Sequence, residues 1–510
     1  MSRDPDRRIA IRVLIVNTIA FTVCFAVWMM NGVLVTFLVD QRTMVFDKAQ
    51  MGWLLGIPVL TGSLLRLPVG LFTDRWGGRR VYAGVMLVTA PFCWLVGSAT
   101  GFTDLALYSL GFGIAGTSFA VGIAYSSVFF PRHQQGTALG IFGAGNAGAG
   151  LTSLGAPALL RWLTDGGANP EGWRWFPRIY AVVLVVMAVV FWFLTVDKRD
   201  PASGNKTLAQ NLAPLGSVRV WRFGLYYFLV FGGFVALSQW LIPYYVNVYA
   251  VSVGMAGLLA SIFTFPSGFI RALGGWLSDK LGARTVMYWV LGGCLAGSVL
   301  LVVPRMDIFA SGEGVMAAAP GKVTEVTPEK VVIDSKAYPL KAPDPDHDLK
   351  IADSQTFVFP TGRFWQEPVV KVGDTVVKKQ LVAKGVSHIY FQANIWIFTS
   401  IACFIGILMG IGKAAVYKHI PEYFPHDVGV VGGIVGVLGG LGGFVCPILF
   451  GYLLRGYGLW TTCWMFFAVL SAACLIWMHL VVRRMMARRV PEVAEMIDHE
   501  HLPQSEGGPA

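Results

Sequence analysis

About twelve stretches of roughly 20 mostly apolar residues run through the chain, and they constrain its fold more than any other feature. A helix of that length spans the hydrocarbon core of a bilayer, where every backbone group must bond within the protein. The expected helices lie near residues 12–39, 50–73, 81–99, 104–130, 136–161, 177–196, 223–249, 252–277, 286–303, 393–417, 428–454 and 459–482. The sequence therefore predicts an all-α membrane protein with twelve transmembrane helices.

Basic residues set the expected orientation. Lys and Arg gather in the short loops that lie on one side of the bilayer if the count is twelve, and such residues mark the cytoplasmic side. Both termini are therefore expected in the cytoplasm, with the chain in the cytoplasmic (inner) membrane. Arg161, Arg174 and Arg178 fall on the other side, so the bias is incomplete. The net charge of +11 reflects this topology and gives no reason to expect nucleic-acid binding.

One segment occurs twice, about 205 residues apart. RLPVGLFTDRWGGRR (66–80) returns as RALGGWLSDKLGART (271–285), and this repeat predicts two pseudo-symmetric six-helix halves. The first half covers 1–196, a cytoplasmic linker covers 197–222, the second half covers 223–303 and 392–484, and a cytoplasmic tail covers 485–510. The turns that end the two copies are predicted to be gating and structural elements, through Gly70, Asp74, Arg75, Gly77, Arg79, Asp279 and Gly282.

Arg66 and Arg271 begin the two copies inside otherwise apolar stretches. With a helix start near Gln50, Arg66 lies about 24 Å along the helix, close to the bilayer midplane. An arginine there costs about 2.5–3.5 kcal/mol on insertion scales. A structural ion pair is the alternative explanation, but no Asp or Glu lies well inside any of the stretches. We therefore expect the two arginines to bind an anionic substrate.

Two glycine-rich runs lie in the expected fifth and eleventh helices. They read GTALGIFGAGNAGAG (136–150) and GGIVGVLGGLGG (432–443), and small residues of this kind let membrane helices approach closely. Gly143, Gly145, Gly436 and Gly440 are assigned to this structural role. Asn146 is the one amide in the first run. It either contacts the substrate or forms an interhelical hydrogen bond.

Residues 304–391 interrupt the second half with about 88 residues of low hydropathy. The segments GKVTEVTPEKVVID and EPVVKVGDTVVKKQLVAKG alternate apolar and polar residues between Gly-Asp and Pro turns, which predicts a small β domain. The pattern resembles biotinyl and lipoyl carrier domains, without the lysine in the Met-Lys-Met hairpin that those carriers modify. The orientation above makes this insertion face outward, as an unmodified gating or interaction domain with a possible periplasmic partner.

The paired D-(R/K)-x-G loops, the basic central loop Asp197–Arg222 and the parallel halves resemble the major facilitator superfamily. The glycine runs, the segment GWRWFPRIYA (172–181) and the paired arginines resemble its nitrate/nitrite porter branch. That resemblance implies a planar anion held between Arg66 and Arg271, in a pocket that Asn146, Phe119, Tyr227 and Phe231 line. It also implies nitrate transport in nitrate assimilation by a protein expected to be monomeric.

Coupling has two interpretations. Nitrate/nitrite exchange needs no titratable group, which suits an interior without carboxylates. The helix containing GGFVALSQWLIPYYVNVY resembles the proton-linked importers of the branch, which favours nitrate/proton symport. Asp40 and Lys413 are poor proton sites, and Lys413 is expected near the inner interface, where its amine can reach water.

Two further hypotheses stay open: a transporter-like anion sensor that signals through the insertion, and a carrier of another small anion such as a carboxylate. The sequence has no nucleotide-binding loop and no nucleophile–base pair, so an enzyme is not expected. Its seven cysteines lack metal-ligand spacing, so neither a metal nor a cofactor is expected.

Overall fold

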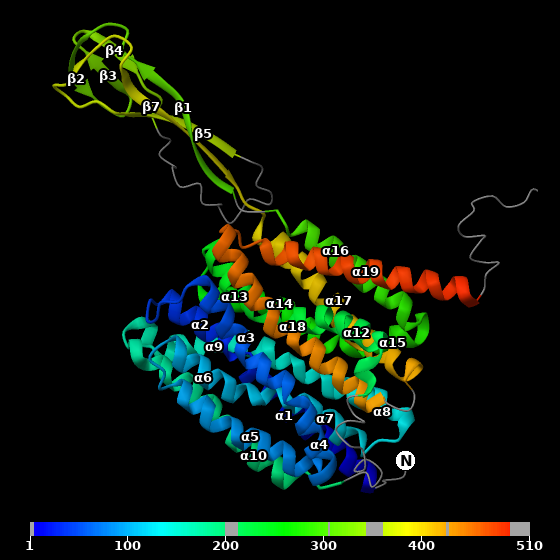
Figure 1. The fold of residues 1–510 in the computed structure, drawn as a ribbon. Helices are drawn as coiled ribbons and strands as arrows, with labels where there is room; N and C mark the ends of the chain where they lie inside the picture. Colours follow the sequence, from blue (N-terminus) through cyan, green and yellow to red (C-terminus); the bar gives the residue numbers. More distant parts are fainter. Residues whose placement is uncertain (1–4, 199–212, 304–305, 343–360, 425–427, 490–510) are drawn as a thin grey trace, which may run out of the picture. The chain divides into compact units, whose positions relative to one another are not determined.

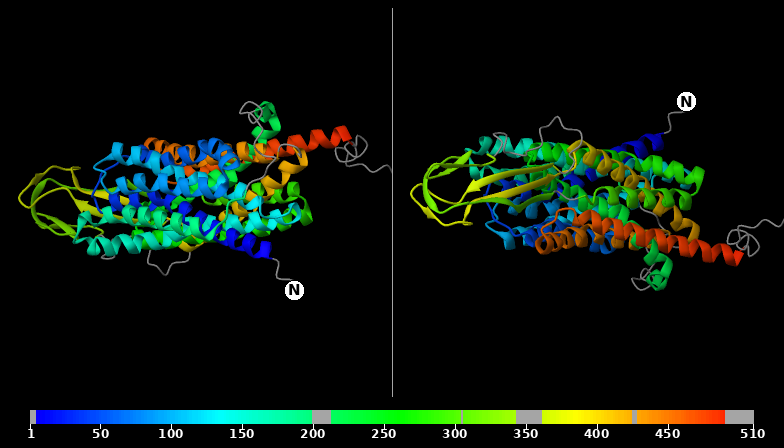
Figure 2. Two further views of the ribbon diagram at one scale, coloured as in Figure 1. Left: turned by 90° about the horizontal axis from the view of Figure 1, so that it is seen from below. Right: turned by 90° about the horizontal axis from the view of Figure 1, so that it is seen from above.

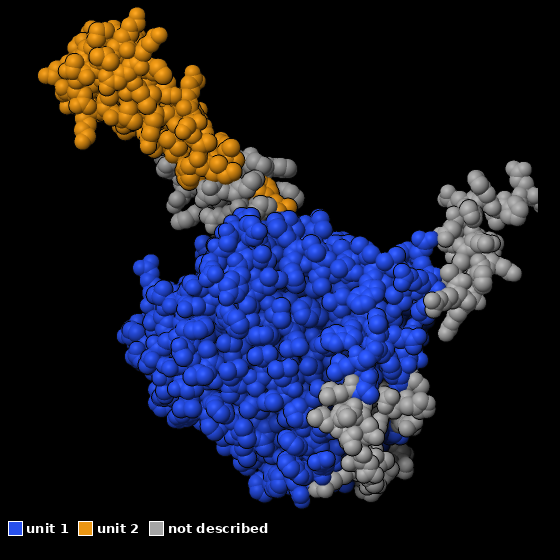
Figure 3. Space-filling model, viewed as in Figure 1, with its two compact units in different colours: residues 1–302, 399–510 blue, residues 303–398 orange. Residues whose placement is uncertain are grey.

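The computed structural model describes residues 5–198, 213–303, 306–342, 361–424 and 428–489. Most of the expected linker and most of the expected tail lie outside these residues. The chain divides into two compact units, residues 1–302 with 399–510 and residues 303–398 (Figure 3). The first is helical and the second is built of strands (Figure 1).

The first half of the helical unit consists of helices that are repeatedly broken within one expected span. Short 3₁₀ turns, marked η, join several of the pieces. The elements are α1 Pro5–Trp28, α2 Met30–Asp40, α3 Lys48–Leu64, α4 Arg66–Trp76, α5 Gly78–Val96, α6 Phe102–Phe112, η1 Gly113–Thr117, α7 Ser118–Ser127, α8 Arg132–Gly143, η2 Ala144–Ala147, α9 Gly148–Leu163, η3 Asp165–Gly167, η4 Pro170–Arg174 and α10 Trp175–Leu194.

The second half is broken in the same way in its first two spans, and its last three helices are long and continuous. Its elements are η6 Ala213–Gly216, α12 Val218–Tyr227, the π-helical turn η7 Phe228–Gly232, α13 Gly233–Tyr249, α14 Val253–Phe269, α15 Arg271–Leu281, α16 Ala283–Leu300, α17 Ile395–Tyr423, α18 Val428–Tyr457 and α19 Thr462–Arg489.

The described residues contain nine helices long and apolar enough to cross a membrane, or ten if the bent pair α14 and α15 counts as one span. The sequence predicted twelve. The two remaining windows are helical as well, in α5 and in α8, η2 and α9. Arg79 and Arg80 lower the mean hydropathy of α5, and the many glycines with Asn146 lower that of the other helix. The start of α1 and the end of α19 lie at the same end of the unit, which indicates an even number of crossings (Figures 1 and 2).

The two halves meet along symmetry-related helix pairs. The most extensive contacts between them join α3 to α18 and α9 to α14. Glycines make this approach possible, because a Cβ on Gly52 would lie 2.4 Å from the Pro447 carbonyl oxygen, and one on Gly257 would lie 2.1 Å from that of Ser153. Such distances exclude any side chain at these positions and bring the centres of the two halves together.

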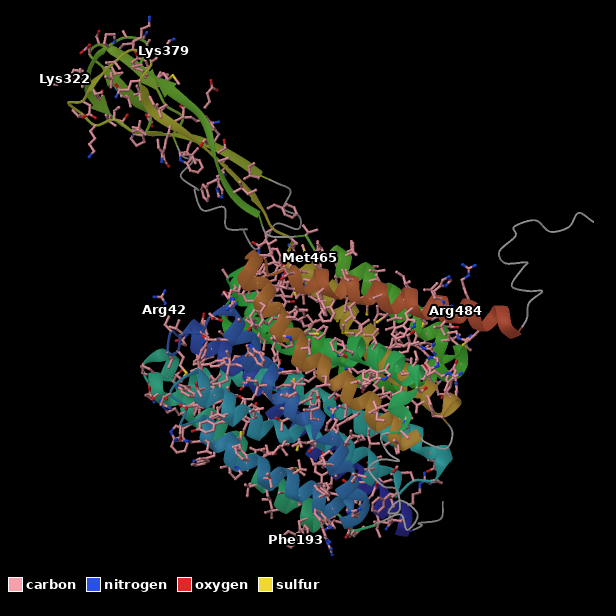
Figure 4. All side chains as sticks on the ribbon, in the orientation of Figure 1. Arg42, Phe193, Lys322, Lys379, Met465 and Arg484 are labelled. Atoms are coloured by element: carbon pink, nitrogen blue, oxygen red, sulfur yellow. The ribbon has the colours of Figure 1, made fainter. Side chains whose placement is uncertain are left out.

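The second unit contains seven strands: β1 Met306–Met316, β2 Gly321–Val326, β3 Lys330–Ile333, β4 Lys336–Pro339, β5 Thr361–Pro368, β6 Thr375–Val376 and β7 Leu381–Phe391. They form a three-stranded sheet in the order β1-β7-β5 and a four-stranded sheet in the order β4-β3-β2-β6, with antiparallel pairing throughout. Apolar side chains such as Val323, Val331 and Val382 fill a small core. Lys322 and Lys379 lie at its surface, so solvated lysines surround this core (Figure 4).

Candidate functional site

Arg66 is the first residue of α4, directly after a break at Leu65 that ends α3. Its side chain is 3% exposed. Nη1 donates to the Gly436 carbonyl oxygen at 2.8 Å, and Nε donates more weakly to that of Gly116 at 3.4 Å. Gly436 belongs to α18, so this guanidinium links the two halves. Its Nη2 is buried without a hydrogen-bond partner among the described groups.

Arg271 occupies the equivalent place, at the first residue of α15 after a break at Ile270. It is 9% exposed, and its Nη1 has no hydrogen-bond partner within the described part of the chain. The Cζ atoms of both arginines lie 5.3 Å from the centre of the Phe119 ring, so they are within about 11 Å, twice that distance, of each other. The repeat in the sequence therefore becomes one site, with a single ring beside both cations.

Aromatic rings surround the two arginines. The rings of Tyr227 and Phe231 stack at 5.0 Å and 5°, and Phe231 stacks on Phe119 at 6.0 Å. Tyr227 directly precedes the π-helical turn η7 and Phe231 lies within it, where the helix contains an extra residue per turn. Tyr417 meets Tyr227 edge to face at 5.0 Å. The three rings that the resemblance implied are therefore neighbours, as a cage of flat apolar surfaces beside the cations.

Trp28 and Tyr417 complete the cage, and the predicted set of residues missed both. Trp28 lies 5.6 Å from the Arg66 Cζ, and Tyr417 lies 5.7 Å from that of Arg271. Each aromatic face stabilises a cation by about 0.5–2 kcal/mol, which partly offsets the burial of the two guanidinium groups. Buried tryptophans and tyrosines are common in this chain, so sequence alone gave no reason to select these two.

Asn146 lies in the 3₁₀ turn η2 and is fully buried. Neither its amide nitrogen nor its amide oxygen has a hydrogen-bond partner among the described groups. Gly143 is three residues earlier on the same helix, and a Cβ there would lie 3.0 Å from Cδ of Arg271. Asn146 is therefore about one helical turn from a residue that packs on Arg271. An unpartnered buried amide has both a donor and an acceptor available for a ligand.

The other glycines of the two runs press against the site or its supports. A Cβ on Gly440 would lie 2.2 Å from Ser63 Oγ and 3.3 Å from Arg66 Nη1. One on Gly436 would lie 3.0 Å from the Tyr417 hydroxyl, and one on Gly145 would lie 2.4 Å from the Phe21 ring. Close packing at these positions brings the carbonyl oxygens and rings within reach of the arginines.

The turns that end the two copies lie away from the arginines. Gly77 and Gly282 both cap their helices with positive φ, at 87° and 83°, a conformation that favours glycine. Arg79 donates to the carbonyl oxygen of Trp192, and Asp279 pairs with Lys418 of α17. Gly70 faces open space. Asp74 lies half-buried near the end of α4, and Arg75 follows it, exposed. The duplicated turns thus have matching backbones and different partners.

Lys413 differs from its expected position. It is fully buried in α17, its Nζ donates to Ser267 Oγ at 3.1 Å, and that nitrogen lies 3.2 Å from the centre of the Phe234 ring. The expected location near the inner interface is wrong because α17 continues to Tyr423, so Lys413 lies in its interior. No Asp or Glu is among the buried side chains that the structure describes.

The arginine site is closed in this conformation, since both guanidinium groups are almost fully buried. A cleft of about 310 Å³, including its open mouth, lies elsewhere between α12, α17 and α19, beside Arg222, Tyr226 and His419. The described residues contain no group of three or more His, Cys, Asp or Glu side chains arranged to hold a metal ion. The two arginines therefore bring two positive charges and unpartnered donors together in one buried place among the described residues.

Known proteins resemble this chain over most of its length. Residues 16–323 and 381–501 match the family model of the Major Facilitator Superfamily. The chain is 39% identical to a probable nitrate/nitrite antiporter NarK1 of Thermus thermophilus, over 94% of this chain and 93% of that protein. It is 28% identical to the nitrite extrusion protein of Bacillus subtilis, over 60% of this chain and 75% of that protein. A probable nitrate transporter NarT of Staphylococcus epidermidis is 24% identical, over 91% and 95%.

Solved structures agree on the fold. A bacterial homologue of the human lysosomal transporter Spinster, in an inward-facing and occupied conformation, matches with a TM-score of 0.60 at 14% identity, over 94% of this chain and 98% of that one. The nucleoside transporter NupG matches with a TM-score of 0.56 at 12% identity, over 92% and 98%. At these identities the likeness concerns the architecture alone.

Proposed function

Because this chain belongs to the Major Facilitator Superfamily and, within it, to the nitrate/nitrite porters, we propose that it carries nitrate, with nitrite as a second substrate, by alternating access around Arg66 and Arg271. The protein is a multi-pass membrane transporter and not an enzyme. The observation that carries the proposal is the convergence of two buried guanidinium groups, one from each half, on the single ring of Phe119.

A planar oxyanion suits this arrangement. A guanidinium is a flat fork of donors that can pair with two oxygens of an oxyanion at once, whereas a lysine is a point charge that does not fix a plane. Arg66 Nη2 and Arg271 Nη1 are buried donors without described partners, and Asn146 adds an amide. We propose that the anion binds these groups. Phe119, Tyr227 and Phe231 would then limit its size and fix the plane in which it lies.

Alternating access follows from the same charges. Two like charges in a low-dielectric interior repel each other, and an anion between them removes that repulsion. The halves therefore close more readily around a bound anion than around water. The duplicated turns at Asp74 and Asp279 are proposed to stabilise successive conformations at the end of the bundle, and the glycine runs let the halves pivot closely.

The test replaces each arginine with lysine, which keeps the charge and removes the fork. Arg66→Lys and Arg271→Lys should each lower nitrate uptake into reconstituted vesicles by about 10- to 150-fold, because a lost charge-assisted hydrogen bond costs about 1.5–3 kcal/mol. Arg484→Lys, on an exposed arginine of α19, is the matched control (Figure 4). Uptake that persists in both site variants while they insert normally would refute the proposal.

For coupling, we propose nitrate/proton symport, with nitrate/nitrite exchange as the second candidate. The resemblance of the α13 segment supports symport. Exchange is supported by the absence of acids from the described buried side chains, and antiport is the activity that the name of the Thermus thermophilus relative states. Adding nitrate to vesicles without a gradient separates the two. External alkalinisation indicates symport, and uptake that requires internal nitrite without a pH change indicates exchange.

The remaining topology is also a proposal. We propose twelve spans, counting α5 and the broken helix of α8, η2 and α9, with both termini in the cytoplasm of the inner membrane. The even count agrees with the shared end of α1 and α19 (Figure 2). Residues 304–391 would then be extracytoplasmic, available to a periplasmic partner, in a protein that works as a monomer.

A further inference from the structure

Lys413 is a buried amine that the binding of the anion does not use. Its Nζ has one hydrogen-bond partner, Ser267 Oγ, and lies against the face of Phe234. No acidic side chain among the described residues forms a salt bridge with it. A charged ammonium in such a place is costly, and a lysine readily gives up its proton when it is buried.

Arg271 Cζ lies 5.7 Å from the ring of Tyr417, which is one turn after Lys413 on α17. Ser267, the partner of Lys413, is one turn before Arg271 across the break at Ile270, and Gly274 packs on Ile411 of α17. Arginine stays charged in proteins, so Lys413 is the member of this pair that responds. A protonated Lys413 would therefore add a second positive charge close to Arg271.

The other groups around Lys413 leave this dependence intact. Tyr417, on its own helix, and Tyr227 behind it are the remaining described titratable neighbours of the arginine pair. The elements packed on this part of α17 contribute side chains that do not titrate, namely Ser267 of α14, Val230 of η7, Phe234 of α13 and Val290 of α16.

We propose that Lys413 is the proton-carrying group of this transporter and that it takes up a proton when an oxyanion binds Arg271. One proton passes from water on the open side to the neutral amine as one nitrate enters, which forms an ammonium. When the halves reopen on the other side and the anion leaves, the ammonium returns its proton to water there. No net charge moves, and the arginines keep theirs. This inference rests on the proposed nitrate transport and assigns its coupling.

The experiment measures nitrate binding to the purified full chain as a function of pH, by calorimetry in two buffers of different ionisation enthalpy. The wild-type protein should take up about one proton per nitrate. Its nitrate affinity should therefore fall about tenfold for each unit by which the pH rises, over the range where the free amine is neutral. Lys413→Gln keeps a donor for Ser267 and cannot titrate. Lys413→Arg stays charged. Both variants should bind nitrate with an affinity that does not change with pH.

Transport provides the second readout. Lys413→Gln should carry nitrate against nitrite in exchange while nitrate-driven alkalinisation falls at least tenfold. Lys48→Gln, which removes an amine at the start of α3, should keep wild-type proton movement. Wild-type binding without proton uptake, or unchanged proton uptake in Lys413→Arg, overturns the inference even if Lys413→Gln fails to fold. Neither result affects nitrate transport itself, whereas a wild-type protein that does not carry nitrate refutes the proposed function.

Discussion

The two arginines of the repeat have the same place in the backbone and different surroundings. Arg66 is held by two carbonyl oxygens, one of them from the opposite half, and lies beside three aromatic rings. Arg271 lies beside two rings, one of them that of Tyr417, which is four residues after Lys413, and its Nη1 has no hydrogen-bond partner among the described groups. Equivalent places in the backbone therefore hold cations with different neighbours, and among the described hydrogen bonds only the first cation donates to a carbonyl oxygen of the opposite half.

The difference between the two arginines is tested most directly by measuring nitrate binding and the rate of exchange separately in Arg66→Lys and Arg271→Lys. Arg271→Lys should weaken nitrate binding by about 30-fold, within the 1.5–3 kcal/mol of a charged hydrogen bond. Arg66→Lys should weaken binding less and slow exchange at saturating nitrate more, because it loses the bond to Gly436 of the other half. Calorimetry and counterflow give the two quantities. Equal effects of both variants on both quantities would show that the halves are functionally equivalent.

Glycines that pack beside the two arginines provide a second test of the difference between them. Gly440→Ala should lower the transport rate about 5- to 150-fold, since its Cβ would overlap Ser63 Oγ and overpacking costs about 1–3 kcal/mol. Gly143→Ala should do less, because its Cβ would meet the flexible Arg271 chain at 3.0 Å. Gly292 of α16 faces open space, so Gly292→Ala serves as the control. A larger defect in Gly143→Ala than in Gly440→Ala would contradict the assignment.

The smallest expected difference concerns the helix caps. Both glycines combine a positive φ with an extended ψ, a conformation that costs other residues about 1–3 kcal/mol, so Gly77→Ala and Gly282→Ala should both lower the thermal midpoint in detergent by a few degrees. Gly77→Ala should lower it more, because its Cβ would lie 2.2 Å from Asp197 Oδ1, whereas that of Gly282 meets nothing within 4 Å. Identical midpoints would mean that the surroundings of Gly77 adapt freely.

The sequence predicted well those features that depend on the type of side chain and that occur in both halves. The arginines were found because two unpaired charges occur at equivalent points of apolar stretches, and the family and transporter class are confirmed. The carbonyl oxygens of Gly116 and Gly436 carry no sequence signal, because every residue has one. Lys413 was misplaced because hydropathy ended its helix at residue 417, and the helix continues to Tyr423 with charged residues.

Helix breaks were the other limit. Leu65 and Ile270 are neither glycine nor proline, but a proline lies within four residues of each break, Pro68 after the first and Pro266 before the second. Proline removes a helical hydrogen bond at such a point, and hydropathy does not register this. The expected pocket residues Asn146, Phe119, Tyr227 and Phe231 are all buried, and their contact with an anion stays a prediction.

The π-helical turn Phe228–Gly232 also affects how this chain is compared with others. Such a turn is equivalent to one residue inserted into a regular helix. A gapless alignment with a relative that lacks it can match α12 or α13 in register, but not both. Tyr227 precedes this turn and Phe231 lies within it, so their counterparts elsewhere are best identified by superposing the helices on each side separately.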